Sequence, residues 1–182
     1  MNLNEEGNVA YKLFKESLDW LRENYGSFTF FTERDLEWML QTHIADEITQ
    51  KNLPYRIFND WPIERGKKYA DLVIRSTTES DEFKVEVAIE IKYEPDHKRK
   101  DFRKKKLESP IVSWSDNTNQ SSVTGDVKRI KTFVEADRAV TGYAIFIDEG
   151  SYFRNKKKMP DGCEWYDKFG RTSGALLIFK NG

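Results

Sequence analysis

The strictly alternating run from Lys84 to Tyr93, KVEVAIEIKY, constrains the fold of this chain more than any other segment. Side chains of a strand point to opposite faces in turn, so the run predicts a strand with one apolar face. The other face carries Glu90 and Lys92, which stand on the same side about 7 Å apart. Because an apolar face has to be covered, we expect this strand to belong to a sheet packed against helices.

A second run of strand type, YADLVIR from Tyr69 to Arg75, precedes it, and the polar segment TTESDE separates the two. Together they predict an antiparallel hairpin whose loop is longer than the tightest class. Pairing of the strands brings Asp71 toward Glu90 and Lys92, in the spacing D-x18-E-x-K. Two carboxylates and one amine would then converge on one part of the sheet.

Helical spacing of apolar residues marks three further segments. The first runs from Asn8 to Tyr25 and is followed by a glycine. The second starts at Thr32, which together with Asp35 forms a variant of the capping box, and it continues to about residue 51. The third is expected from Asp126 to Val140, with Asp126 as a cap or first-turn residue rather than a ligand.

The second predicted helix carries two acidic side chains where apolar ones are expected. On a helical wheel, Glu33 and Glu37 fall inside or at the edge of its apolar arc. Carboxylates rarely point toward a core without a reason, so both are candidates for a site. The alternative for Glu33 is a simple preference for the helix N-terminus, where the helix dipole favours negative charge.

Two nearly all-apolar runs, Gly142 to Asp148 and Gly174 to Lys180, are typical of strands buried on both faces. Arg56 to Phe58 is a candidate for one more strand. The resulting order predicts an α/β fold in which helices cover a mixed sheet. We expect a single domain over residues 1–182, with an N-terminal helix in 1–27, a core in 32–148 and a C-terminal hairpin or strand extension in 149–182.

Converging carboxylates need a cation, because two acids at short range raise each other's pKa unless their charge is offset. Mg²⁺, which prefers oxygen ligands, would meet this need between Asp71 and Glu90, with Mn²⁺ as its substitute. The ion could polarise a phosphodiester while Lys92 holds the phosphate or helps to activate a water. The opposite interpretation is an ordinary exposed strand face, on which Glu90 and Lys92 pair with cross-strand charges such as Arg75.

The run from Thr32 to Lys92, with TERDLEWML, YADLVI and VAIEIKYEP, resembles the PD-(D/E)XK nuclease superfamily, also called restriction-endonuclease-like. The resemblance implies a central four-stranded mixed sheet flanked by helices in α-β-β-β-α-β order, here with an extra N-terminal helix. It also implies a site that binds Mg²⁺ and cuts DNA or RNA. The sequence departs from the motif at Ala70, where proline is frequent.

Carried over residue by residue, the resemblance implies that Asp71 matches the first acid of the motif, Glu90 the second acid and Lys92 the lysine. The second predicted helix looks like the helix of archaeal Holliday junction resolvases that brings an extra acidic ligand. Glu33 is the match for that ligand and Glu37 is its reserve. The implied catalytic set is therefore Glu33, Asp71, Glu90 and Lys92, and its three acids are the implied metal ligands.

Charge is balanced overall but unevenly distributed along the chain. With 30 Lys and Arg against 31 Asp and Glu, the composition excludes indiscriminate coating of nucleic acid. The segment from His97 to Lys106, however, holds seven Lys or Arg and one Asp. It predicts a local contact with a phosphate backbone, and its alternative is a solvated loop. The predicted nucleic-acid-binding residues are Lys98, Arg99, Lys100, Arg103 and Lys104.

Cys163 is the only cysteine, which excludes an intrachain disulfide framework and a cysteine-based zinc cluster. The N-terminal residues lack a basic segment followed by an apolar one, and no run approaches the roughly 18 apolar residues that a membrane span needs. We therefore expect a soluble cytoplasmic protein with no membrane partner.

These observations predict a Mg²⁺-dependent nuclease that hydrolyses phosphodiester bonds of nucleic acid, with DNA as the favoured substrate. Many enzymes of the superfamily act as dimers or within larger systems, so a homodimer or a targeting partner belongs to the prediction. One rival is a nuclease-like fold that has lost catalysis and binds nucleic acid or protein. Another is an unrelated α/β interaction protein, which a wide separation of Asp71 and Glu90 would favour.

Overall fold

The computed structural model describes residues 9–64, 68–81, 84–99, 111–115, 122–154, 157–167 and 175–181. Within these residues helices and strands follow one another in an order that begins with two helices and ends with three strands. The elements are α1 (Val9–Asn24), the 3₁₀ turn η2 (Tyr25–Ser27), α2 (Glu33–Gln50), β1 (Tyr55–Glu64), β2 (Lys68–Ser76), β3 (Val85–Glu94), α3 (Val123–Glu135), β4 (Ala139–Asp148), β5 (Cys163–Asp167) and β6 (Ala175–Asn181).

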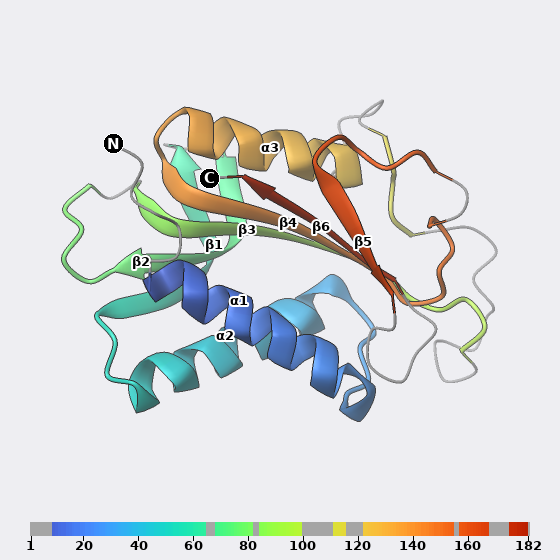
Figure 1. Cartoon of the computed structure of the whole chain (residues 1–182), viewed down its shortest axis with the longest axis horizontal. Coiled ribbons are helices and arrows are strands. Elements are labelled where there is room, and N and C mark those ends of the chain that lie inside the picture. Colours follow the sequence, from blue (N-terminus) through green and yellow to red (C-terminus); the bar gives the residue numbers. More distant parts are fainter. Residues whose placement is uncertain are drawn as a thin grey trace.

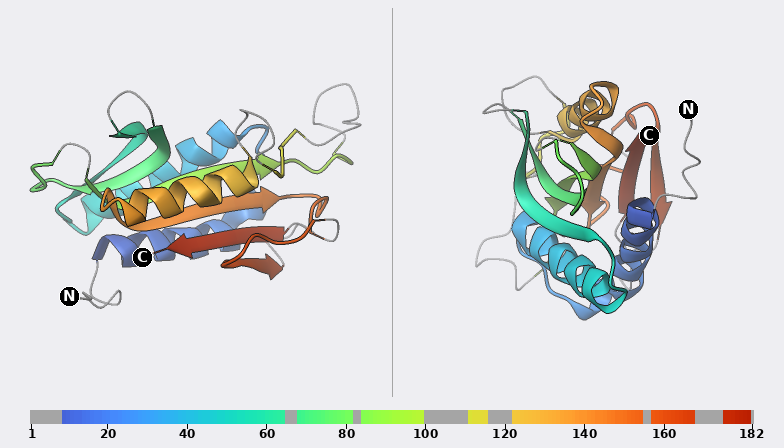
Figure 2. Two further views of the ribbon diagram at one scale, coloured as in Figure 1. Left: turned by 90° about the horizontal axis from the view of Figure 1, so that it is seen from above. Right: turned by 90° about the vertical axis from the view of Figure 1, so that its left-hand side faces the viewer.

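The strands form one sheet in the order β1-β2-β3-β4-β6-β5. β3 and β4 run parallel, and every other neighbouring pair is antiparallel. A parallel pair needs a connection that crosses over the sheet, and α3 lies in that connection. Figure 1 and Figure 2 show α3 on one face of the sheet and the pair α1 and α2 on the other. The sheet is therefore covered from both sides.

Alternation along β3 explains how the two layers are filled. Val87, Ile89 and Ile91 are buried in the core that α1 and α2 share with the sheet. Ala88 points the other way, into the core that α3 completes through Ile130. Because neighbouring side chains of a strand face opposite layers, the acids of β3 at even-numbered positions point to the side of α3. The apolar face of this strand thus fixes where its charged face lies.

The expected α/β class and mixed sheet are confirmed, but the sheet has six strands rather than four. The strand expected over Arg56 to Phe58 is part of a longer one, β1. The sequence predicts a C-terminal hairpin or strand extension in 149–182 but does not delimit β5, because CEWYD is short and lies at the edge of the sheet. β5 pairs antiparallel with β6 and forms one edge of the sheet.

The third helix begins and ends earlier than the predicted span from Asp126 to Val140. Ser122 caps it, since its hydroxyl accepts a hydrogen bond from the Gly125 amide at 3.0 Å. Asp126 therefore lies inside the first turn, one turn beyond the cap. The apolar residues from Ala139 onward belong to β4 instead of the helix.

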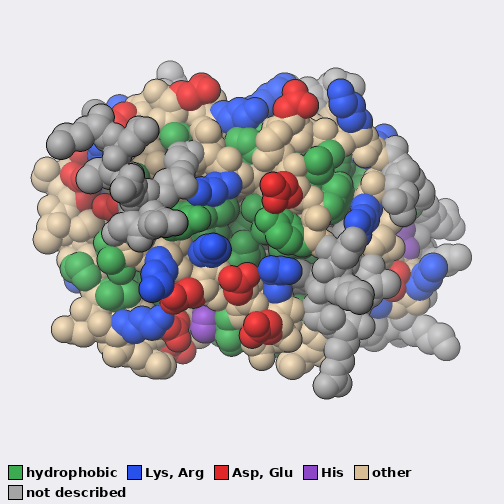
Figure 3. All heavy atoms as spheres, in the orientation of Figure 1, with side chains coloured by type: hydrophobic (Ala, Val, Ile, Leu, Met, Phe, Trp, Pro, Cys, Tyr) green, Lys and Arg blue, Asp and Glu red, His purple; other side chains and the backbone are tan. Residues whose placement is uncertain are grey.

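None of the described helices is long and apolar enough to span a membrane. On the face drawn in Figure 3, Lys and Arg are interspersed with Asp and Glu, and hydrophobic side chains gather in the middle of the face between α3 and α1. No field of one sign covers this face. A further concentration of charge lies beside β2 and β3, where Glu90 and Lys92 are buried.

Candidate functional site

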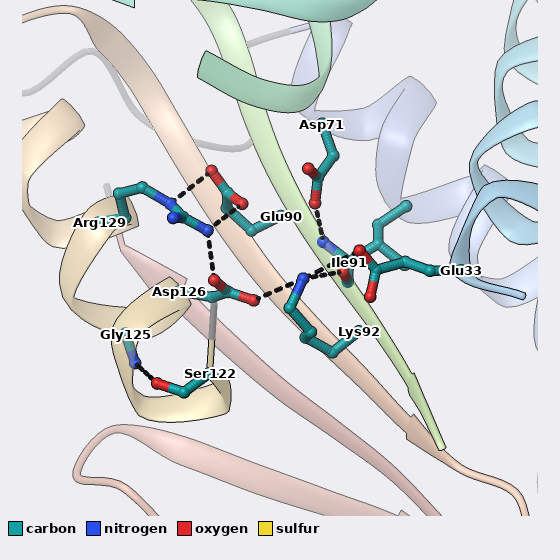
Figure 4. A network of polar contacts seen from close by, with 9 residues as sticks. All are labelled: Glu33, Asp71, Glu90, Ile91, Lys92, Ser122, Gly125, Asp126 and Arg129. Carbon is teal, nitrogen blue, oxygen red and sulfur yellow. Dashed lines mark hydrogen bonds and ion pairs between the residues drawn. The ribbon is translucent and has the colours of Figure 1, made fainter. Parts of the chain in front are cut away.

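Backbone pairing between β2 and β3 covers Leu72 to Ile74 of β2. At the next position, Asp71 contributes its side chain in place of a backbone group: Oδ2 accepts a hydrogen bond from the Ile91 amide at 2.7 Å (Figure 4). The described ladder of β2 and β3 thus ends at Leu72, and the Asp71 side chain continues the contact between the two strands.

Three carboxylates meet beside this point. Ligand oxygens of Glu33, Glu37 and Asp71 all lie within 4.8 Å of one another. The start of α2 supplies the first two, and its position is fixed by Asp35, whose Oδ2 accepts hydrogen bonds from the amides of Phe31 and Thr32 at 2.8 Å. The capping interaction predicted for Asp35 is thus present, and it places Glu33 and Glu37 on the side of α2 that faces β2.

Burial dominates the electrostatics of the two glutamates of α2. Burial first, and then the nearby charges of Asp71 and Glu33, raise the pKa of Glu37 to about 7. Burial also raises the pKa of Glu33, although the Lys92 ammonium acts against it. Both acids therefore hold protons more tightly than exposed glutamates, and a cation placed between them and Asp71 would release those protons.

Lys92 occupies the centre of the site, with its side chain only 9% exposed. Its Nζ lies 2.9 Å from Glu33 Oε1 and 3.3 Å from Asp126 Oδ2, and it donates to the Ile91 carbonyl at 3.0 Å (Figure 4). Burial alone would lower the pKa of Lys92, but Asp126, Glu33 and Asp71 together outweigh it and the pKa is raised. The buried amine is therefore a permanent cation at neutral pH.

Glu90, which is 1% exposed, faces Arg129 of α3. The guanidinium donates from Nε to Oε1 at 3.0 Å and from Nη2 to Oε2 at 2.7 Å, and Nη2 also contacts Asp126 (Figure 4). Burial, followed by the charges of Asp71 and Asp126, raises the pKa of Glu90, while Arg129 opposes the rise. Burial likewise raises the pKa of Asp126 to about 6 against the effect of Lys92 and Arg129.

The four residues of the predicted catalytic set all contribute to this one network, but in two groups. Asp71 and Glu33 belong to the group of three carboxylates, which Glu37 completes. Both oxygens of Glu90 are bound by Arg129, and Glu90 is not part of that group among the described residues. Glu33 and Glu37, which the sequence offers as alternatives, therefore lie in the same group.

Asp126 and Arg129 are the residues that sequence reasoning did not place in the site. Asp126 was expected as a cap, yet it is 2% exposed and pairs with Lys92. A signal was present, because Asp126 falls in the same helical arc as Val123, Val127 and Ile130, as an inward carboxylate. Asp126 could be recognised as an inward residue only if the helix starts at Val123, whereas the predicted start is Asp126 itself.

The basic run is described only at its beginning. Lys100, Arg103 and Lys104 lie outside the described residues. Arg99 points inward, with its side chain 16% exposed, and pairs with Glu149 at 3.1 Å while donating to the Phe30 carbonyl at 2.8 Å. Arg99 therefore holds two segments of the chain together in this structure, whatever further contact its charge makes.

The side chains gathered here can hold a divalent cation through oxygen atoms, bind an anion through the Lys92 ammonium and exchange protons near neutral pH through Glu37. They come from α2, β2, β3 and α3, which are far apart in the sequence. In comparisons with known proteins, no family model, no curated protein and no solved structure matches this chain.

Proposed function

We propose that this chain is a Mg²⁺-dependent nuclease that hydrolyses phosphodiester bonds, with DNA as the favoured substrate and Mn²⁺ as a substitute ion. One observation carries the proposal: oxygens of Glu33, Glu37 and Asp71 lie within 4.8 Å of one another, beside the buried amine of Lys92. The element order α2-β1-β2-β3-α3-β4 adds support, because it follows the α-β-β-β-α-β order of the PD-(D/E)XK superfamily. In this proposal β6 and β5 extend that core.

The donor set suits a hard cation. Mg²⁺ takes oxygen ligands at about 2.1 Å, so two oxygens on opposite sides of one ion lie about 4.2 Å apart. The oxygens of the three carboxylates lie within 4.8 Å of one another, so small side-chain rotations would bring them to this spacing. Glu90 would join them only after Arg129 turns away, and Glu33 would share its carboxylate between the ion and Lys92.

The protein groups divide the remaining work. When bound, the cation would polarise the phosphodiester and offset charge on the leaving oxygen. Lys92 would bind a phosphate oxygen, because its ammonium is charged and shielded from water by burial. Glu37 would act as a ligand, because the cation would displace the proton that the metal-free carboxyl holds up to a pKa of about 7. Arg129 and Asp126 would position Glu90 and Lys92.

The test is cleavage of labelled single-stranded and duplex DNA and of RNA by the purified chain, with and without Mg²⁺ or Mn²⁺. Asp71→Asn, Glu37→Gln and Lys92→Met should each lower the rate at least ~100-fold, because each removes a metal ligand or the phosphate-binding cation. Calorimetric titration with Mn²⁺ should show one site in the unaltered chain and none in Asp71→Asn.

The matched control is Glu86→Gln, which removes a carboxylate from the same strand, four positions before Glu90 and outside the network. It should leave both cleavage and Mn²⁺ binding unchanged. Circular dichroism and thermal melting confirm that each variant is folded. Cleavage that persists at the same rate in Asp71→Asn and Lys92→Met would assign the activity to a contaminant and sink the proposal.

The pairing of Glu90 with Arg129 favours a second candidate, a nuclease-like fold that binds nucleic acid without cutting it. With Glu90 held by Arg129 and Glu33 held by Lys92, the network already neutralises much of its own charge. In that case nucleic-acid binding survives Asp71→Asn, does not depend on Mg²⁺ and falls steeply as salt is raised. Absence of Mn²⁺ binding together with such behaviour would select this candidate.

A further inference from the structure

A pocket of about 300 Å³ opens beside the carboxylate and lysine network. This volume is at the small end of ligand pockets, which suits one flat ring system rather than an extended molecule. Glu33 and Lys92 form its charged side, and its other walls are mainly apolar. The wall residues used in the argument are Phe31, Tyr93, Pro95 and Ile111.

Buried hydrogen bonds fix the walls of this pocket. Glu94, which is fully buried, accepts hydrogen bonds from the amides of Ile111 at 2.9 Å and Val112 at 2.8 Å. Tyr93, on β3, donates from its hydroxyl to Glu149 at 2.8 Å. The pocket is therefore preformed, because Ile111 and Val112 are tied to buried Glu94 and Tyr93 is tied to buried Glu149.

Two wall residues expose apolar surface that the rest of the described chain does not cover. Phe31 is 44% exposed and Ile111 is 54% exposed. The guanidinium of Arg99 lies 5.4 Å from the centroid of the Phe31 ring, which holds that ring in place through a cation–π contact. An aromatic ring held in this way is a platform on which another flat ring can stack.

We propose that this pocket binds the base of an unpaired nucleotide whose phosphate lies at Lys92, so that the substrate is single-stranded nucleic acid. The inference rests on the proposed nuclease function and names its substrate class. Three features select a nucleobase: a small, mainly apolar space, an aromatic wall, and the cation of Lys92 with the carboxylate of Glu33 at one side, where the attached phosphodiester would lie. A paired base is stacked between its neighbours and reaches such a pocket only by leaving the helix.

Binding is measured by fluorescence anisotropy with a labelled single-stranded oligonucleotide and with its duplex, in Ca²⁺ instead of Mg²⁺. The single strand should bind more tightly. The double substitution Phe31→Ala and Ile111→Ala should weaken single-strand binding by about 10-fold and leave duplex binding unchanged, since one stacked base is lost. The control, Val140→Ala, removes a similarly exposed apolar side chain outside the pocket and should change neither.

A second readout uses single strands that carry one 2-aminopurine at successive positions. Stacking in the pocket should change its emission at one position, and the double substitution should abolish the change. Thermal melting shows whether the variant is folded. A variant that does not fold is replaced by Phe31→Leu, which keeps the volume, removes the aromatic face and should give the same loss.

The outcomes separate this proposal from the nuclease function. If Asp71→Asn binds single strands with the same preference and the preference depends on Phe31, the pocket stands even where no cleavage is found. If cleavage depends on Asp71 and Lys92 but single strand and duplex bind alike in every variant, the nuclease function stands and the pocket proposal is overturned. Equal loss of both substrates in the double variant overturns it as well.

Discussion

Buried charge is compensated residue by residue in this site, with one exception. Glu33 pairs with Lys92, and Glu90 pairs with Arg129. Glu37 has no ion pair among the described residues, although it is only 8% exposed, and its neighbours Asp71 and Glu33 carry the same charge. Its protonated form is therefore favoured up to a pH of about 7, which makes Glu37 one of the residues that link stability to pH.

The first prediction concerns this link. The pKa of Glu37 rises from its ordinary value of 4.5 to about 7, so the folded chain binds more protons than the unfolded chain between those values. The free energy of unfolding of the metal-free protein therefore falls as pH rises through this window. In Glu37→Gln this fall should shrink by on the order of 1–2 kcal/mol, measured by urea unfolding at both ends of the window.

The control for that prediction is Glu23→Gln on the exposed surface of α1, which should follow the unaltered chain at both pH values. Addition of Mg²⁺ should stabilise the protein more at the upper end of the window. Glu37 is ionised there, so the ion does not have to displace a proton from it. A pH dependence that is the same in Glu37→Gln and in the unaltered chain would contradict the assigned pKa.

At the scale of elements, the site is the place where helices from both faces of the sheet are joined. Lys92 of β3 contacts Glu33 of α2 and Asp126 of α3, and Arg129 binds α3 to Glu90 of the same strand (Figure 4). Each of these ion pairs has at least one buried partner, so removal of the other partner should cost more than the loss of an exposed salt bridge. The attachment of α3 should therefore depend on polar as well as apolar contacts.

The second prediction tests the attachment of α3. Arg129→Met leaves the fully buried Glu90 without its cation and should lower the free energy of unfolding by about 3 kcal/mol at pH 8. The loss should be smaller at pH 5, because Glu90 can then take up a proton. The double substitution Arg129→Met and Glu90→Gln should recover part of the loss. Urea unfolding of the unaltered chain, of Arg129→Met, of Glu90→Gln and of the double variant gives the coupling free energy of the pair. Strict additivity of the two single losses would contradict an interaction between Arg129 and Glu90.

The elements that sequence reasoning predicts well are those with a clear period or cap. Strict alternation identifies β3, and the pair of Thr32 and Asp35 marks the start of α2. The bounds of β5, within the hairpin or strand extension expected in 149–182, are not predicted because five residues at a sheet edge carry little signal. The bounds of α3 are misjudged because Ser122, its cap, lies in a segment rich in Ser, Asn and Thr that resembles a linker.

One part of the site could be predicted from the sequence and another could not. Asp71, Glu90 and Lys92 lie on two strands that follow one another along the chain, so their spacing in the sequence predicts that they meet. Arg129 enters only because β3 and β4 are parallel, which brings the crossover helix over β3. The spacing of residues within β3 or α3 does not indicate that the two elements lie together, so Arg129 could not be predicted as the partner of Glu90.

At the scale of the whole molecule, the separation between the sheet and α3 is set by a glycine. Gly142 of β4 lies under the helix, and a Cβ added there would stand 2.6 Å from Cγ2 of Ile130. Ile130 belongs to the core that α3 completes, and Gly142 lies next to it. The absence of a side chain at Gly142 lets the helix approach the sheet closely enough for Arg129 to reach Glu90.

The third prediction follows from that close approach. Gly142→Ala should lower the free energy of unfolding by about 1–3 kcal/mol, because the added methyl group overlaps a packed side chain. The companion substitution Ile130→Ala removes the overlapping atom but leaves a cavity. The double variant should lose less than the two single losses together, as measured by thermal and urea unfolding. Full additivity would show that the two positions do not touch.

The hydrogen bond from the Ile91 amide to Asp71 turns one backbone proton into a magnetic reporter of the site. A bond to an ionised acceptor is shorter and stronger than one to a carbonyl, so this proton should resonate at low field in a ¹H–¹⁵N spectrum. A cation on the other oxygen of Asp71 would withdraw charge from the acceptor and move the resonance upfield. Titration of labelled protein with Mg²⁺ can therefore follow occupancy at a single atom, before any substrate is known.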